Sequence, residues 1–455
     1  MTVRQQLTLL LLLSVPSILS QLSSIVMEYI DAAMVGHLGA ESSAAIGLVA
    51  SSLWLMFGLQ IAFTNGFAVQ VAHRIGAQDD AGARDVVRQS IIVALVFSML
   101  LMAFCLAISP YVPYWLGGKG EVALMAKDYF FVFVLMIPMF QLHSLSCAML
   151  RCAGDMKVPS MVNILICVLD VVFNYVFIYW FEMGVWGAAW GSWVAEFIGT
   201  AIAFYCLVWR NPKLRIIDDV KLRFDELVRH YTPTRGMLVS AMHISSPLML
   251  ERFVLSGAQI MITIIVAPLG TIAIAANALA VTAEGLCYMP GFGVGEAATT
   301  LVGQAIGAKR RRLTHWFAWI SVGLGMAVMS VMGMVMYLAA PLMMGIMTPV
   351  PEIISLGTEV LRIEAWAEPM FAAAIVSYGV FMGAGNTLPP CLMEICSMWC
   401  VRISLAWWLA PIIGLRGVWI AMCVELCFRG TIFLLRMYFG KWDKKIDDGP
   451  LADGA

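Results

Sequence analysis

Residues 27–39 read MEYIDAAMVGHLG and close the first long apolar run of the chain, which extends over 7–34. Glu28 and Asp31 are three positions apart in this stretch, so a helix presents both acids on one face. The run is long enough for a bilayer, whose hydrocarbon core takes about 20 apolar residues per helix. We therefore predict a membrane helix that carries two carboxyl groups at membrane depth, where acids are costly and functional candidates.

The whole chain shares this apolar character. Of its 455 residues, 61% are hydrophobic and 13% are charged, and the formal net charge is −1. Soluble domains carry about 25% charged residues, so this composition excludes a soluble enzyme. The lack of a net positive charge also excludes a nucleic-acid partner. Because no nucleophile–base pair, metal-ligand spacing or phosphate-binding loop is visible, we expect neither catalysis nor a bound cofactor.

The turn after the first run recurs in the second half of the chain, and Pro16 recurs as Pro247, 231 residues later. Four loop segments keep an offset of 231 or, for the last pair, 230: 37–40 in 268–271, 74–77 in 305–308, 153–155 in 384–386, and 184–187 in 414–417. Chance similarity between apolar sequences does not hold one register across four loops. We infer an internal duplication.

Twelve apolar runs follow from the same pattern, six in each half. They cover residues 7–34, 44–72, 88–109, 124–148, 159–181, 185–208, 238–267, 272–304, 314–340, 353–383, 388–411 and 415–437. Because six is even, both halves start on the same side of the membrane and the repeats are parallel, a plan found in secondary transporters. We predict an all-α membrane protein of twelve transmembrane helices in two six-helix lobes. The predicted divisions are an N-lobe at 1–209, a cytoplasmic linker at 210–236, a C-lobe at 237–440 and a cytoplasmic tail at 441–455.

The basic residues lie mostly on one side of these runs. The two ends of the chain and the connections after the even-numbered runs hold 21 of the 28 lysines and arginines, and the opposite connections hold four. By the positive-inside rule, both termini face the cytoplasm. We expect a multi-pass protein of the cell inner membrane, in contact with membrane lipids.

A second helix of the first half also carries polar groups. Asp170 and Asn174 are four positions apart, and with Glu28 and Asp31 they aim carboxylates and an amide at a common interior. Such oxygens can carry a proton or ligate Na⁺, a hard cation. Pro16, about four turns before Asp31, leaves a carbonyl unpaired and allows the first helix to bend. We predict a cation-coupling site here, with Asp31, Asp170 and Asn174 as the candidate Na⁺ ligands.

The second half has further acids inside its runs. Glu251, Glu284 and Glu368 are candidates for a second acidic cavity that binds a cation or the substrate. Glu368 lies at an expected helix break, because a proline follows it. Glu425 and Arg429, four positions apart, are expected to pair with each other. Two other acids are expected to pair with neighbouring helices or to lie near an interface, and are left out of the site: Glu196 and Glu394.

Six stretches carry a recognisable combination of motifs: 27–39, 66–77, 151–159, 184–189, 303–308 and 382–386. In this order, and over essentially the whole chain, they resemble the multidrug and toxic compound extrusion (MATE) family. The resemblance implies twelve helices in two six-helix lobes that form a V. It also implies H⁺- or Na⁺-coupled antiport that exports amphipathic, often cationic, drugs and toxic organic compounds by alternating access.

The resemblance implies roles for single residues. Asp31 stands at the helix 1 aspartate of the family's N-lobe cation site, and Pro16 stands at the bending proline. Asp170 and Asn174 occupy the helix 5 pair in the reverse order, and Ser192 occupies the helix 6 hydroxyl position.

In the second half, Glu251 matches an acid that some members use for Na⁺, and Glu368 loosely matches a second one. The choice between the two lobes, the choice between H⁺ and Na⁺ and the substrate stay open, and we expect a monomer. An ion gradient is the expected driver, worth about 2.3 kcal/mol per charge and 100 mV. The alternatives are a lipid-linked oligosaccharide flippase of the same superfamily, which would need a basic cavity, and a channel, which conducts without exchange.

Overall fold

The computed structural model describes residues 3–216 and 231–443, and within these ranges the regular structure is helical, without a strand. The expected all-α class is therefore confirmed. Most of the expected linker at 210–236 and of the expected tail at 441–455 lies outside the described residues.

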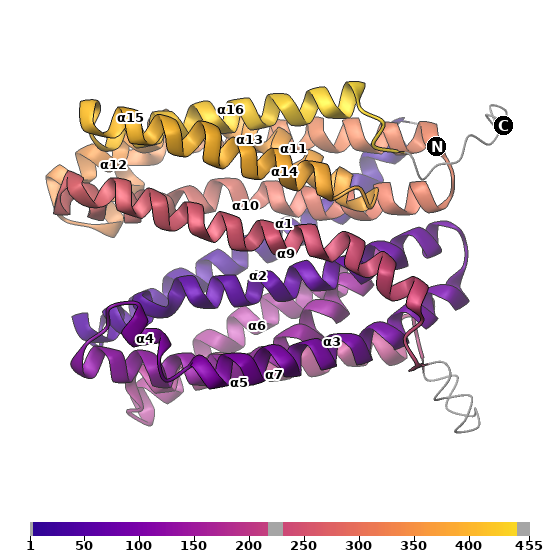
Figure 1. Cartoon of the computed structure of the whole chain (residues 1–455), viewed down its shortest axis with the longest axis horizontal. Helices are drawn as coiled ribbons and strands as arrows, with labels where there is room; N and C mark the ends of the chain where they lie inside the picture. The colour runs from indigo at the N-terminus through magenta and orange to yellow at the C-terminus, as the bar shows by residue number, and fades with distance from the viewer. Residues whose placement is uncertain (1–2, 217–230, 444–455) are drawn as a thin grey trace. The chain divides into compact units, whose positions relative to one another are not determined.

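The described part of the first half forms six long helical spans, the short helix α4 and connecting turns. Figure 1 shows these helices running alongside one another. Their bounds are α1 (Val3–Gly36), α2 (Ala40–Gly76), α3 (Asp80–Ile108), α4 (Val112–Trp115), α5 (Gly120–Cys152), α6 (Lys157–Tyr175), η1 (Val176–Trp180), α7 (Gly184–Tyr205) and η2 (Cys206–Arg210). The π-helical turns η1 and η2 continue α6 and α7, so each pair makes one span.

The second half repeats this order of helices. Its bounds are α9 (Arg235–Val266), η4 (Ala267–Leu269), α10 (Thr271–Gly307), α11 (Arg311–Met347), α12 (Pro351–Glu364), α13 (Glu368–Gly383), α14 (Leu388–Cys396), η5 (Ser397–Ile403), α15 (Ser404–Ile413) and α16 (Leu415–Phe439). Here α14, η5 and α15 together form one span.

The described residues contain eleven helices that are long and apolar enough to cross a membrane, or twelve when the bent pair α12–α13 is counted as one span. The two helices of this pair meet at 58°, next to Glu368. The expected break is thus confirmed. Its cause is Pro369 in the first turn of α13, where a residue without an N–H fits a new helix but cannot continue the previous one.

Backbone geometry repeats along with the sequence. Residues with positive φ recur at the predicted offsets of 231 or 230: Gly39 (120°) and Gly270 (96°), Gln78 (61°) and Lys309 (56°), Gly154 (93°) and Gly385 (69°), Gly184 (60°) and Gly414 (64°). Left-handed backbone is rare outside glycine, and Gln78 and Lys309 adopt it at equivalent turns. The duplication is therefore visible in the loops as well as in the apolar runs.

The helices group into two compact units. We call Ser23–Met249 the N-terminal unit, and Met1–Leu22 together with Leu250–Ala455 the C-terminal unit. The boundaries fall inside α1 and α9, not in the 210–236 segment. Consequently α1 carries Pro16 in the C-terminal unit, and Glu28 and Asp31 in the N-terminal unit.

Each unit is built from long helices packed on one another. In the N-terminal unit, α5 packs against α2, α3 and α7, and α6 packs against α7. In the C-terminal unit, α10, α11 and α13 pack together and α16 covers α13. These helix pairs bring polar side chains of different helices together inside each unit.

Candidate cation-binding sites

The predicted residues of the first half converge on one side chain. The Asn174 amide, on α6, donates one hydrogen bond to Asp31 Oδ1 on α1 at 2.9 Å and another to Asp170 Oδ2 at 3.0 Å. Asp170 and Asn174 are each 2% exposed, and Asp31 is partly exposed. The structure thus brings two carboxyl groups and one amide from two helices together inside the N-terminal unit.

Two other predicted residues border this group. The Ser192 hydroxyl, on α7, is hydrogen-bonded to the Asp170 side chain, and the Asp31 and Asp170 carboxyl groups also reach each other. Glu28 lies about one turn before Asp31 and interacts with it electrostatically, but its side chain is exposed. We call Asp31, Asp170, Asn174 and Ser192 the N-terminal acid site, with Glu28 at its open side.

The Asn174 carboxamide has spare capacity for a ligand. Its nitrogen donates hydrogen bonds to Asp31 and Asp170. Its buried oxygen has no hydrogen-bond partner in the part of the chain that the structure describes. A carbonyl oxygen and two carboxylates are the oxygen donors that a hard cation prefers. The donor set therefore suits Na⁺ as well as a proton.

Gly191 on α7 lets that helix approach Asn174. A Cβ atom at Gly191 would lie 2.0 Å from Asn174 Oδ1 and 2.8 Å from its backbone nitrogen. The backbone atom cannot move aside as a flexible side chain can. The close approach of α6 and α7 therefore depends on the absence of a side chain at this position.

We expect Gly191→Ala to destabilise the protein and to disturb the N-terminal acid site. Overpacking of a buried contact costs about 1–3 kcal/mol, and here Asn174 would have to shift. The measurement is thermal unfolding of the purified protein together with Na⁺- and pH-dependent quenching of tryptophan fluorescence. The matched control is Gly36→Ala, because nothing lies within 4 Å of the added Cβ there. Equal unfolding temperatures and equal fluorescence quenching in the two variants would contradict the packing argument.

Pro16 lies in the other unit, on a tightly packed part of α1. The neighbouring Ser17 hydroxyl donates to the carboxylate of Glu296 on α10. A Cβ atom at Gly293 would lie 2.7 Å from the Ile18 backbone nitrogen, so α1 and α10 touch closely. This contact could not be predicted from helical spacing, because Glu296 is 279 residues away from Ser17 along the chain.

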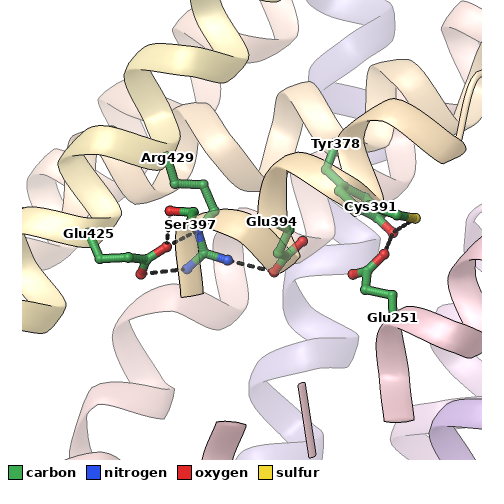
Figure 2. A network of polar contacts seen from close by, with 7 residues as sticks. All are labelled: Glu251, Tyr378, Cys391, Glu394, Ser397, Glu425 and Arg429. Atoms are coloured by element: carbon green, nitrogen blue, oxygen red, sulfur yellow. Dashed lines mark hydrogen bonds and ion pairs between the residues drawn. The ribbon is translucent and has the colours of Figure 1, made fainter. Parts of the chain in front are cut away.

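In the C-terminal unit, Glu251 belongs to a hydrogen-bonded network (Figure 2). The Tyr378 hydroxyl donates to Glu251 Oε2 at 2.5 Å and lies 3.5 Å from the Cys391 sulfur. The Glu251 carboxylate therefore already has a hydrogen-bond donor, a tyrosine from α13.

The same view shows the ion pairs of Arg429 (Figure 2). Its guanidinium lies 2.5 Å from Glu394 Oε1 and 3.0 Å from Glu425 Oε1. The Ser397 hydroxyl also donates to Glu425, at 2.6 Å. The expected pairing of Glu425 with Arg429 is confirmed, and so is the expectation that Glu394 pairs with a neighbouring helix.

Glu284 and Glu368 lie in a different cluster from Glu251. They interact electrostatically with each other and with Glu364, and Arg402 faces Glu284 and Glu364. The predicted trio of second-half acids is therefore divided between two groups.

Glu364 and Glu368 are 0% exposed, and none of their four carboxylate oxygens has a hydrogen-bond partner among the described residues. Sequence reasoning did not select Glu364 or Arg402. The available signal was spacing: Glu364 lies four positions before Glu368, across the helix break.

A duplicated set of membrane-spanning helices, with acids buried in each half, is a plan that membrane transporters use. The comparisons with known proteins agree. The MatE family model matches the chain twice, at residues 16–176 and 247–408. The two matches begin at the repeat-related prolines, Pro16 and Pro247. The chain belongs to the MatE family and is a multi-pass membrane transporter.

Similar proteins cover nearly the full length. The probable multidrug resistance protein NorM of Thermotoga maritima is 27% identical, over 96% of this chain and 93% of its own. The protein of the same name from Rhizobium meliloti is 24% identical, over 97% and 95%.

Two solved structures share the fold. The Vibrio cholerae MATE transporter VcmN in its bent form superimposes with a TM-score of 0.86 at 18% identity, over 98% of each chain. A MOP superfamily transporter from Pyrococcus furiosus, whose reversed binding-pocket polarity suggests a different function, has a TM-score of 0.90 at 21% identity, over 98% of this chain and 97% of its own.

Proposed function

We propose that the protein is an H⁺- or Na⁺-coupled antiporter that exports amphipathic, often cationic, organic compounds by alternating access. It would act as a monomer in the cell inner membrane, with both termini cytoplasmic. The observation that carries the proposal is the double hydrogen bond from Asn174 to Asp31 and Asp170 inside a membrane-spanning unit. The multidrug resistance names of the relatives support the class of substrate.

The N-terminal acid site can exchange a cation because its negative charge has no basic partner among the described residues. Two carboxyl groups this close cannot both stay ionised in a buried site unless a cation joins them. A proton can bind to either carboxyl group. For Na⁺, rotation of the Asn174 carboxamide would turn its unpartnered oxygen toward the ion.

Cation binding at this site can act on α1. Among the described hydrogen bonds, Asp31 is the residue of α1 that accepts from Asn174 on α6. Neutralising Asp31 weakens the hold of α6 on α1. The same helix is fixed near Pro16 by the Ser17–Glu296 contact in the C-terminal unit. We propose that α1 bends at Pro16 when the charge of Asp31 changes, and that this bend drives substrate release.

The second-half acids are the weaker candidates for coupling. Glu251 already accepts a hydrogen bond from Tyr378, and Arg429 neutralises Glu394 and Glu425. The carboxylate oxygens of Glu364 and Glu368 accept no hydrogen bond among the described residues, so a second cation or a cationic substrate could bind beside them. We propose that coupling occurs at the N-terminal acid site and that the Glu364–Glu368 pair contributes to cation binding in the C-terminal unit.

The flippase alternative is less well supported by the charges. An anionic lipid-linked pyrophosphate needs a basic cavity, whereas buried acids outnumber buried arginines in the C-terminal unit. The Pyrococcus furiosus relative illustrates that pocket polarity can differ between proteins of this fold.

The test is ethidium transport by the full chain in proteoliposomes, first under a pure Na⁺ gradient and then under a pure pH gradient. We expect uphill ethidium movement with at least one gradient and none when both are collapsed by ionophores. Ethidium flux that continues unchanged without any gradient would indicate a channel and would refute the proposal. Transport of a lipid-linked oligosaccharide, with no ethidium transport, would favour the flippase.

A further inference from the structure

Helix α9 carries an arginine at membrane depth that the proposed coupling site does not use. Arg252 lies near the middle of this helix, in the part that belongs to the C-terminal unit. At 1.5 Å per residue, roughly 20–25 Å of helix extends beyond it in each direction. The Arg252 side chain is exposed. Because a charge is costly in lipid, an exposed arginine in the middle of a span faces water and not the lipid tails.

Three further polar side chains lie on the same face of α9. Ser256, Gln259 and Thr263 follow Arg252 by four, seven and eleven positions, so they lie within about 40° of it around the helix. Gln259 and Thr263 are exposed, and Ser256 is half-buried. We call Arg252, Ser256, Gln259 and Thr263 the α9 polar stripe.

The apolar exposed face of α9 is a different one. Phe253, Ile260 and Ile264 are each more than half exposed, and they lie about a quarter of a turn around the helix from the α9 polar stripe. A membrane helix with two exposed faces of opposite character turns the apolar face to lipid and the polar face to water. The stripe therefore borders an aqueous path along the C-terminal unit.

Two members of the stripe have polar groups to offer a ligand. The Ser256 and Thr263 hydroxyls donate to their own helix, to the carbonyls of Arg252 at 2.9 Å and of Gln259 at 3.0 Å. The Arg252 guanidinium and the Gln259 carboxamide make no hydrogen bond within residues 3–216 and 231–443. These two side chains are therefore the binding groups of the stripe.

The charge of Arg252 is not neutralised by the acid beside it. Glu251 interacts with Arg252 electrostatically, but adjacent side chains on a helix point about 100° apart. The Glu251 carboxylate accepts its hydrogen bond from Tyr378, and no ion pair joins it to Arg252 in the described part of α9. The positive charge is thus available to an anionic ligand.

The internal repeat indicates that the fold does not require this charge. The residue 231 positions before Arg252 is Gln21 on α1, a neutral amide that donates to Glu296 at 3.4 Å. The equivalent helix of the first half is therefore built with glutamine at this position. What Arg252 adds is a cationic group that faces water, and a role toward a ligand explains it better than a role in packing.

We propose that Arg252 binds the anionic group of an amphipathic organic substrate and that Gln259 hydrogen-bonds a second polar group of the same molecule. A guanidinium offers two parallel N–H donors to a carboxylate. Gln259 lies two turns further along the same face, about 10 Å away. The stripe thus selects elongated zwitterions that carry a carboxylate. This inference rests on the proposed export of amphipathic compounds and names a substrate class for it.

The test compares two dyes that differ in one group. Rhodamine B carries a carboxylate beside its cationic ring system, and rhodamine B ethyl ester lacks that negative charge. We expect the full chain in proteoliposomes to bind and export rhodamine B in preference to the ester. Arg252→Gln should weaken equilibrium binding of rhodamine B about tenfold or more, because a charge-assisted hydrogen bond is lost, and should leave binding of the ester unchanged.

Two variants accompany this measurement. Arg252→Lys keeps the charge but not the paired donors, so it should keep part of the preference for rhodamine B. The matched control is Arg362→Gln, which also removes one exposed arginine from the C-terminal unit. The Arg362 Nε donates to the Tyr337 carbonyl at 3.3 Å, away from the α9 polar stripe, and this variant should keep the full preference.

The outcomes separate this inference from the proposed function. Absence of a preference for rhodamine B in the wild-type chain, or an unchanged preference in Arg252→Gln, would overturn the inference, and ethidium export would then leave the proposed function standing. Loss of ethidium and of both dyes in the wild-type chain would refute the proposed function itself. If Arg252→Gln does not fold, Arg252→Met takes its place, and the wild-type preference is a test that needs no variant.

The same comparison distinguishes a substrate from a lipid headgroup, whose phosphate is also anionic. Vesicles are made of phosphatidylcholine alone or with added phosphatidylglycerol. We expect the same preference for rhodamine B in both. A preference that disappears with phosphatidylglycerol in the wild-type chain would show that Arg252 holds a lipid phosphate, and this result would overturn the assignment to a substrate.

Discussion

Asp31→Asn is expected to abolish uphill ethidium export while the protein stays folded. Asparagine has nearly the shape of aspartate, so it can keep a hydrogen bond to Asn174, but it can neither take up a proton nor carry the charge that binds Na⁺. A cycle that moves one charge at 100 mV sustains a concentration ratio of about fiftyfold. The variant should build up no ethidium concentration gradient across the membrane, as measured by ethidium fluorescence in proteoliposomes.

Glu28→Gln is the matched control for this prediction. Glu28 lies about one turn away on the same helix face but is exposed and makes no hydrogen bond to Asn174 in the described pattern. We expect it to keep most of the uphill transport. Equal loss in both variants would mean that general negative charge on α1, and not the Asn174-linked carboxyl group, supports the activity.

Arg429→Met should be the most destabilising single change in the C-terminal unit. Arg429 is paired with Glu394 and Glu425, and Glu425 is completely buried. Removing one partner of a buried ion pair leaves an uncompensated charge and costs about 3–5 kcal/mol. The measurement is the free energy of unfolding in detergent, from denaturant titration followed by tryptophan fluorescence.

Two further variants make this prediction specific. Arg416→Met breaks the exposed Arg416–Glu359 pair, which is equally short at 2.5 Å, and should cost less than about 1 kcal/mol because water screens it. Neutralising Glu394 and Glu425 to glutamine in the Arg429→Met background should recover most of the lost stability. Without that recovery, the loss would come from packing of the arginine side chain and not from charge.

Much of the fold could be predicted from sequence because the solvent is lipid. Each span must be a long apolar helix, so each one appears in the sequence as a separate apolar run. The duplication then predicts the same number of runs in each half. The break before α13 was predictable for a local reason, since Pro369 has no N–H for the preceding helix. The Glu425–Arg429 pair was predictable because four positions on a helix place side chains together.

The candidate site was predictable only in part. The sequence indicated that Asp31, Asp170 and Asn174 belong together, but not that Asn174 bonds to both acids at once. The structure does not place Glu251 with Glu284 and Glu368. Glu251 accepts a hydrogen bond from Tyr378, whereas Glu284 and Glu368 interact with Glu364. Tyr378 is 127 residues from Glu251 and Arg429 is 35 residues from Glu394 along the chain, which is beyond the reach of helical spacing.

By itself, then, the sequence determined the membrane setting, the number and type of spans and the internal duplication, since these follow from composition and local periodicity. Only the tertiary structure decided which acid meets which partner. It also decided that α1 carries Pro16 and Asp31 in two different compact units. The physical reason is that hydrogen bonds and ion pairs between helices act over a few ångströms in space, whereas the groups involved are separated by up to 143 residues at the N-terminal acid site.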